Sequence, residues 1–191
     1  MIIFFMEKVK KENKEKIIEM IEKAGSEKYE TSWDERGIPT SKKTSEIKKG
    51  KSSRARGARF ELKVRKDLEE KGRIVDKWTN NVEFKTDTNN QIIPSTGKLI
   101  IAKRKYNPFK KMLVVGTGFP DFISTKHIHG EMYSVIGVEV KINGVLSKIE
   151  KEKCAWYLKN KIFSQIWIAK NGEKRGEIEY INFEEKYGKK F

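Results

Sequence analysis

Two apolar segments joined by a short turn-forming stretch constrain the fold of this chain more than any other feature. Segments 121–125 and 133–141 are rich in β-branched and aromatic residues, which predicts two antiparallel strands around the turn-forming sequence HIHGEM. The pattern downstream predicts a helix over 147–160 and a strand over 164–169. Because paired strands are followed by a helix and another strand, we expect an α/β layer arrangement.

The sequence before this hairpin predicts a second helix and several shorter elements. An apolar residue at every fourth position indicates a helix over 52–71, for which Ser52 and Ser53 are candidate caps. Its apolar face consists of Phe60, Val64 and Leu68. The remaining predictions are strands in RIVDKW and NVEFKT, a loop over 87–98, and strands near 111–115 and 177–182.

The N-terminal part of the chain is expected to form a separate region, with residues 52–191 as the main domain. Residues 1–51 predict an amphipathic helix over 6–24 followed by a basic linker. Segment 42–59 holds eight Lys or Arg residues and one acid with little apolar periodicity, which predicts a mobile basic arm. The cations expected to contact nucleic acid are Lys48, Lys49, Lys51, Arg54, Arg56 and Arg59.

The charge and the cysteine content narrow the partners and the compartment. A formal net charge of +15 favours a polyanionic partner, nucleic acid above all, although a solvated lysine-rich surface is the alternative. Cys154 is the only cysteine, which excludes an intrachain disulfide framework and a thiolate zinc cluster. No apolar stretch has the length of a membrane span or a signal sequence. We therefore expect an intracellular, cytoplasmic protein that associates with DNA and not with a membrane.

Charged residues interrupt the two apolar strands. Side chains alternate along a strand, so Glu139 and Lys141 share one face, about 6.6 Å apart at their Cα atoms. Charges on a covered face are costly unless they are paired or bind a metal, so a structural ion pair is one explanation. A hairpin would also bring Asp121 beside Glu139. Two carboxylates suit Mg²⁺ or Mn²⁺, which can activate a water for phosphodiester hydrolysis.

These residues, in this order, resemble a known family. Pro120-Asp121 and Glu139-Val140-Lys141 are similar to the two halves of the motif of PD-(D/E)XK nucleases. The resemblance implies a restriction-endonuclease-like core of a helix, a three-stranded meander, a helix and a strand. The stretch SSRARGARFELKVRKDLEEKGRIV resembles the Holliday-junction resolvase branch, whereas GFPDF and GVEVKINGVLS resemble the VRR-NUC branch.

The resemblance also implies a role for each site residue. Asp121, Glu139 and the carbonyl of Val140 would hold the metal ion. Glu61 would be an outer acid of the same site, and Lys141 would be the catalytic cation.

The chain departs from the family pattern in two places. The glutamine typical after the sequence LS is absent, so Glu150 or Lys151 would have to replace it. The interval from Glu61 to Asp121 is long, which predicts an insertion around 83–111.

Several functions remain open on the sequence alone. The favoured one is a divalent-metal-dependent endonuclease, acting as a homodimer on branched or junction DNA. The alternatives are a nuclease for specific duplex sites or RNA, a non-catalytic basic nucleic-acid-binding protein, and an assembly protein that uses the helix over 6–24.

Overall fold

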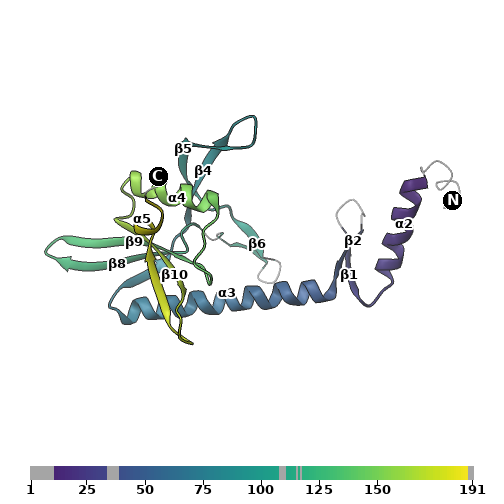
Figure 1. Cartoon of the computed structure of the whole chain (residues 1–191), viewed down its shortest axis with the longest axis horizontal. Helices are drawn as coiled ribbons and strands as arrows, with labels where there is room; N and C mark the ends of the chain where they lie inside the picture. Colours follow the sequence, from purple (N-terminus) through teal and green to yellow (C-terminus); the bar gives the residue numbers. More distant parts are fainter. Residues whose placement is uncertain (1–10, 34–38, 108–110, 115, 117, 189–191) are drawn as a thin grey trace. The chain divides into compact units, whose positions relative to one another are not determined.

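The computed structural model describes residues 11–33, 39–107, 111–114, 116 and 118–188 of the 191-residue chain. The described residues form a mixed α/β structure with four helices and a five-stranded mixed sheet (Figure 1). The chain divides into two compact units, Met1–Arg56 and Gly57–Phe191. Within the described part, no helix combines the length and apolar character needed to cross a membrane.

The first unit contains a helix and a strand pair. Helix α2 spans Lys11–Ala24, so part of the expected helix over 6–24 is present, and residues 6–10 lie outside the described residues. Strands β1 (Tyr29–Trp33) and β2 (Pro39–Lys43) pair antiparallel, although their sequence showed too little periodicity to predict them.

Helix α3 spans Thr44–Glu70, and it corrects two predictions. The helix begins well before Ser52, so Ser52 and Ser53 lie inside it and do not cap it. The basic segment 42–59 is not a mobile arm, because residues 44–59 are helical and the two lysines before them belong to β2.

The early start of α3 has a local physical reason. Lys, Arg, Ala and Glu favour helix, and a helix already anchored by packing extends at little further cost. That anchor is the buried set predicted from the sequence, Phe60, Val64 and Leu68. At the N-terminal end, the N–H and hydroxyl of Thr44 donate to the carbonyl oxygen of Lys28, at 2.9 and 3.2 Å.

The five-stranded sheet forms the centre of the second unit, in the order β11-β10-β9-β8-β3. Strands β3, β8 and β9 pair antiparallel in succession, β10 runs parallel to β9, and β11 pairs antiparallel with β10. The parallel pair is connected through helix α4. The bounds are β3 Ile74–Lys77, β8 Phe122–His129, β9 Met132–Val140, α4 Lys148–Lys159, β10 Gln165–Asn171 and β11 Ile178–Asn182.

Helices cover both faces of this sheet (Figure 1). The C-terminal half of α3 packs against a cluster that includes Phe122, Ile136 and Val138. Helix α4 and the short helix α5 (Phe183–Tyr187) belong to the second cluster, which includes Tyr157 and Ile168. Side chains alternate along β9, so Glu139 points to the face opposite Val138.

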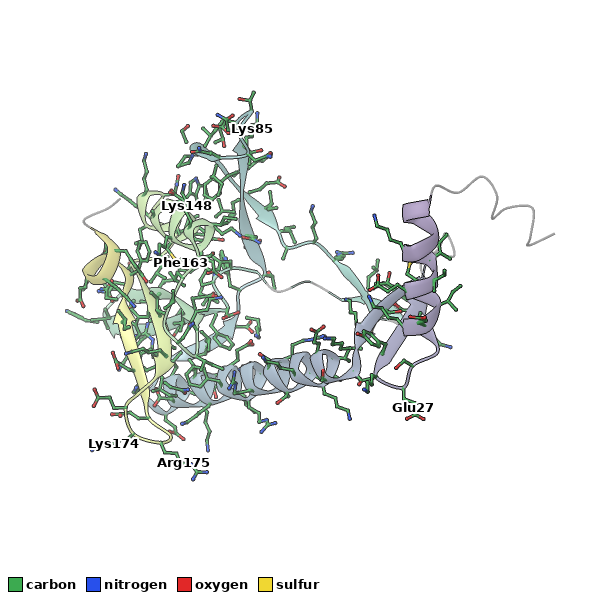
Figure 2. All side chains as sticks on the ribbon, turned by 45° about the vertical axis from the view of Figure 1, so that its right-hand side comes forward. Glu27, Lys85, Lys148, Phe163, Lys174 and Arg175 are labelled. Atoms are coloured by element: carbon green, nitrogen blue, oxygen red, sulfur yellow. The ribbon has the colours of Figure 1, made fainter. Side chains whose placement is uncertain are left out.

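Segment 78–118 lies outside the sheet order and forms two hairpins. Strands β4 (Asn80–Thr86) and β5 (Ile92–Ile101) pair antiparallel, so the prediction of a loop over 87–98 is wrong for most of its length. The Asp87 carboxylate accepts the N–H groups of Asn89 and Gln91, which closes the turn. Strands β6 (Lys105–Asn107) and β7 (Met112–Val114) form the second pair. Figure 2 shows Lys85 on the first hairpin.

Gly137 in β9 occupies a position that admits no side chain. A Cβ atom there would lie 2.8 Å from Cγ of Pro120 and 3.1 Å from the Phe163 ring. We expect Gly137→Ala to destabilise the protein by about 1–3 kcal/mol, because overpacking displaces the residue that precedes Asp121. Thermal unfolding measures this loss, and Gly57→Ala serves as the control because a Cβ at Gly57 meets nothing within 4 Å. An equal melting temperature for Gly137→Ala and wild type would contradict the expectation.

Candidate active site

Asp121 and Glu139 lie side by side where β8 begins and β9 ends. Asp121 immediately precedes β8, and the pairing of Phe122 with Val138 brings it level with Glu139. The Asp121 N–H donates to Oε2 of Glu139 at 3.1 Å, and the Val140 N–H donates to Oδ2 of Asp121 at 3.0 Å. The hairpin therefore brings together the two carboxylates selected from the sequence.

Burial raises the pKa of both carboxyl groups, and the charge of a neighbouring acid adds to the increase in each. Glu139 is only 4% exposed, and its burial together with the charge of Asp121 raises its pKa to about 8. Burial also raises the pKa of Asp121, to which the charge of Glu61 adds. Two acids that are costly to ionise together form a site where a bound cation lowers the free energy.

Lys141 is held between two carboxylates. Its ammonium group lies 3.0 Å from Oε1 of Glu139 and 2.7 Å from Oε1 of Glu150. Burial alone would lower the pKa of Lys141, but the hydrogen bond to Glu150 and the interaction with Glu139 raise it above its usual value. The ion pair considered from the sequence is thus present, and it extends to a second acid.

Glu150 is fixed in place by the start of α4. Its carboxylate accepts the N–H of Ser147 at 2.7 Å, and its own N–H donates to the Ser147 hydroxyl, which together form a capping box. Of the two residues considered as replacements for the family glutamine, Glu150 reaches Lys141. Lys151 instead lies over the Tyr187 ring, 4.5 Å from its centroid.

Glu61 approaches the site from α3 and is paired with a lysine that the sequence did not single out. Its Oε2 lies 2.6 Å from Nζ of Lys77, and that ammonium group also lies 4.6 Å from the centroid of the Phe122 ring. The charges of both Glu61 and Lys77 act on Asp121. Lys77 lies beside Asp121 because β3 pairs with β8. No local sequence pattern indicates that pairing, so the sequence alone does not place Lys77 at the site.

The number of oxygen ligands available at the site fits a hydrated magnesium or manganese ion. Mg²⁺ usually takes one or two protein carboxylates and retains several waters, and Asp121, Glu139 and the Val140 carbonyl meet that need. Among the residues described, no group of three or more His, Cys, Asp or Glu side chains lies close enough together to hold a metal. Glu61 is paired with Lys77, and among the described residues it does not form a preformed triad with Asp121 and Glu139.

The six cations expected to contact nucleic acid all lie on α3, and their side chains are exposed. They are spaced along a helix and not along a flexible chain. These are Lys48, Lys49, Lys51, Arg54, Arg56 and Arg59.

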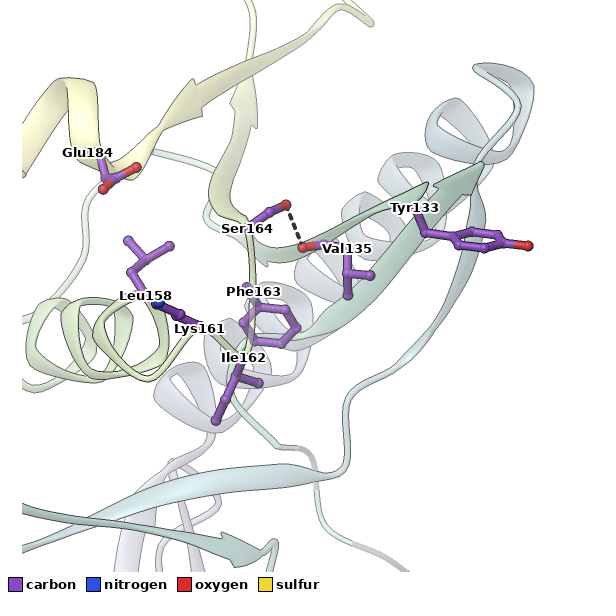
Figure 3. Close-up of a pocket in the computed structure, with 8 residues that line it drawn as sticks. All are labelled: Tyr133, Val135, Leu158, Lys161, Ile162, Phe163, Ser164 and Glu184. Atoms are coloured by element: carbon purple, nitrogen blue, oxygen red, sulfur yellow. Dashed lines mark hydrogen bonds between the residues drawn. The ribbon is translucent and has the colours of Figure 1, made fainter. Parts of the chain in front are cut away.

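One cavity is lined by none of the acidic residues Glu61, Asp121, Glu139 and Glu150. It has a volume of about 460 Å³, and its lining includes Tyr133, Leu158 and Phe163 (Figure 3). The Ser164 hydroxyl donates to the Val135 carbonyl beside it, at 2.8 Å. None of the predicted site residues lines this cavity, so the acidic residues remain the candidate site.

Comparison of the chain with protein-family models, with curated proteins and with solved structures found no significant match.

Proposed function

We propose that this chain is a divalent-metal-dependent endonuclease that hydrolyses phosphodiesters of branched or junction DNA. The observation that carries the proposal is the pair of adjacent carboxylates, buried Glu139 and half-buried Asp121. Each is hydrogen bonded to a backbone N–H of the opposite segment, and Lys141 is paired with Glu139. A purely structural site would gain more from apolar residues here, because buried charges seldom stabilise a fold.

Each residue has a role in this proposal. Asp121, Glu139 and the Val140 carbonyl would hold Mg²⁺ or Mn²⁺, which supplies an activated water and neutralises charge on the phosphate. Lys141 favours the ionised form of Glu139 and orients its carboxyl group through the contact at 3.0 Å. Glu61 would act from the outer side of the site, once released from Lys77.

The order of the elements supports a restriction-endonuclease-like core. Helix α3, strands β3, β8 and β9, helix α4 and strand β10 follow one another as the resemblance to PD-(D/E)XK nucleases implies. The hairpins of segment 78–118 fall between β3 and β8, where the insertion was expected. We further propose a homodimer, which would present two such sites to one branched substrate.

One assay tests the activity and the substrate together. The purified chain is incubated with four-way junction, flap, single-stranded, linear duplex and RNA substrates, with Mg²⁺, with Mn²⁺ and with a chelator. The proposal requires metal-dependent cleavage with a preference for branched DNA. Preference for one duplex sequence or for RNA would reassign the substrate, and no cleavage of any substrate would overturn the function.

The basic residues of α3 make a separate prediction about binding. Replacing Lys48, Lys49, Lys51, Arg54 and Arg56 by alanine preserves helix propensity, so the helix remains while its charge is lost. Each phosphate contact contributes about 0.9 to the slope of log affinity against log salt, so five lost contacts would flatten the slope by up to about 4–5. Fluorescence anisotropy on labelled duplex measures it. A slope equal to that of wild type would place the binding face elsewhere.

A non-catalytic DNA-binding protein is the second candidate. The observation that favours it is the ion-pair network in which Lys141 contacts Glu139 and Glu150. Such a network compensates these acids without a metal ion. This candidate predicts salt-dependent binding without cleavage and no increase in melting temperature on addition of Mg²⁺.

A further inference from the structure

Within the described part of the chain, three lysines interact electrostatically with Asp121 or Glu139, and they differ in what they contact. Lys77 pairs with Glu61, and Lys141 pairs with Glu139 and Glu150. Lys153 is different, because among the described residues no carboxylate lies within ion-pair distance of its ammonium group. The ammonium group of Lys153 can therefore donate hydrogen bonds to a bound ligand.

The position of Lys153 on α4 directs it toward the site. It follows Glu150 by three residues, a spacing that places two side chains on the same side of a helix. Its Nζ lies 5.5 Å from the centroid of the Phe119 ring, and Phe119 is a buried residue two positions before Asp121. The aromatic ring thus holds the ammonium group beside the segment that carries the first carboxylate.

The surroundings of Lys153 are costly for a cation without a partner. The side chain is half-buried, and burial lowers its pKa, while the charges of Glu150 and Glu139 act in the opposite direction. Lys153 is thus close enough to interact electrostatically with both acids without forming an ion pair with either. A single contact with an aromatic ring is weaker than an ion pair, so it compensates such an ammonium only in part.

A phosphate group would complete these interactions. A phosphodiester that approaches Asp121 and Glu139 meets two acidic side chains that do not attract it, and a cation that is already bound to carboxylates is little able to attract it. We propose that Lys153 binds a phosphate oxygen of the DNA substrate beside the carboxylate pair, whereas Lys141 holds Glu139 and Glu150 in place. This inference rests on the proposed function for its substrate, and it assigns the phosphate contact to α4.

Binding without metal tests the phosphate contact independently of cleavage. The affinity of the full chain for a fluorescein-labelled four-way junction and for a labelled duplex is measured in chelator over a range of salt concentrations. Lys153→Ala should reduce the slope of log affinity against log salt by about 0.9, the contribution of one phosphate contact on duplex DNA. Lys153→Arg should retain the slope, because it keeps the charge.

Lys148→Ala is the matched control, since Lys148 is an exposed lysine on the same helix (Figure 2). Five positions separate it from Lys153, which turns it about 140° away around the helix axis. The control should leave the slope unchanged. An unchanged slope for Lys153→Ala, or an equal decrease in both variants, would overturn the phosphate contact.

Cleavage then decides whether that phosphate lies at the reacting centre. With Mg²⁺ and saturating junction DNA, Lys153→Ala should lower the single-turnover rate at least tenfold, and Lys153→Arg should recover part of it. A wild-type rate for Lys153→Ala would overturn its place in the active site. If the wild-type chain cleaves nothing, the proposed nuclease function fails, and the salt slope alone still decides whether Lys153 contacts phosphate.

Discussion

Asp121→Asn is expected to abolish Mg²⁺-dependent cleavage while leaving the folded structure intact. The amide keeps an oxygen for the Val140 N–H but loses the charge that would bind the metal. A catalytic ion contributes several kcal/mol to the transition state, so the rate should fall at least about a thousandfold. Glu139→Ala should lose activity to a similar extent. Single-turnover cleavage of the preferred substrate measures both losses.

Stability separates loss of function from loss of fold in Asp121→Asn. Burial raises the pKa of Asp121, so removing its charge should leave the melting temperature in chelator unchanged or higher. Glu131→Gln is the control, because Glu131 is an exposed acid in the turn between β8 and β9. This variant should cleave DNA at the wild-type rate. Metal-dependent cleavage by Asp121→Asn at the wild-type rate would remove Asp121 from the site.

Lys141→Ala is expected to destabilise the metal-free protein and to lower turnover. It leaves the carboxylates of Glu139 and Glu150 near each other without the ammonium that joins them. Breaking a fully buried pair costs about 3–5 kcal/mol, and because the lysine side chain is 29% exposed we expect about 2 kcal/mol. Thermal unfolding in chelator measures the difference.

The pH dependence of this loss identifies its cause. Burial and Asp121 raise the pKa of Glu139 to about 8 even beside Lys141, and without the lysine the pKa would be higher still. The raised pKa means that the charged form disfavours folding. The destabilisation should therefore increase as pH rises through about 8, so it should be greater at pH 8 than at pH 5, where Glu139 is protonated. Addition of Mg²⁺ at pH 8 should restore part of the stability.

Lys85→Ala provides the control, because Lys85 is exposed on the β4–β5 hairpin. It should leave the melting temperature unchanged at either pH. An equal loss of stability at pH 5 and pH 8 in Lys141→Ala would mean that the lysine acts through its alkyl chain and not through its charge.

The central elements of the second unit could be predicted because local pattern and tertiary packing agree there. The structure has five elements close to their expected positions: β8, β9, α4, β10 and β11. Alternating apolar residues bury one face of a strand, and a helical repeat buries one face of a helix, so each pattern indicates a single type of element. The same alternation placed Glu139 on one face of β9, and the short hairpin placed Asp121 beside it. The carboxylate pair was therefore accessible from sequence.

Other elements depend on contacts between distant segments and gave weaker signals. β5 carries Pro94 and Gly97, which are typical of loops, yet it pairs with β4 through a turn closed by Asp87. The basic half of α3 has no apolar repeat that would predict a helix. It is helical because it continues the helix of the buried half. Lys77 and Lys153 reach the site only through the pairing of β3 and the packing of α4, which no local spacing reveals.

The two hydrogen bonds between carboxylates and backbone tie the chemistry of the site to the alignment of the hairpin. Each joins the segment that carries Asp121 to the strand that carries Glu139. A slip of one residue between these strands would turn their side chains to opposite faces and break both bonds. A misaligned hairpin would therefore lose the acidic pair altogether and could not retain a weakened version of it. Correct strand alignment and an assembled site are thus a single folding event in this chain.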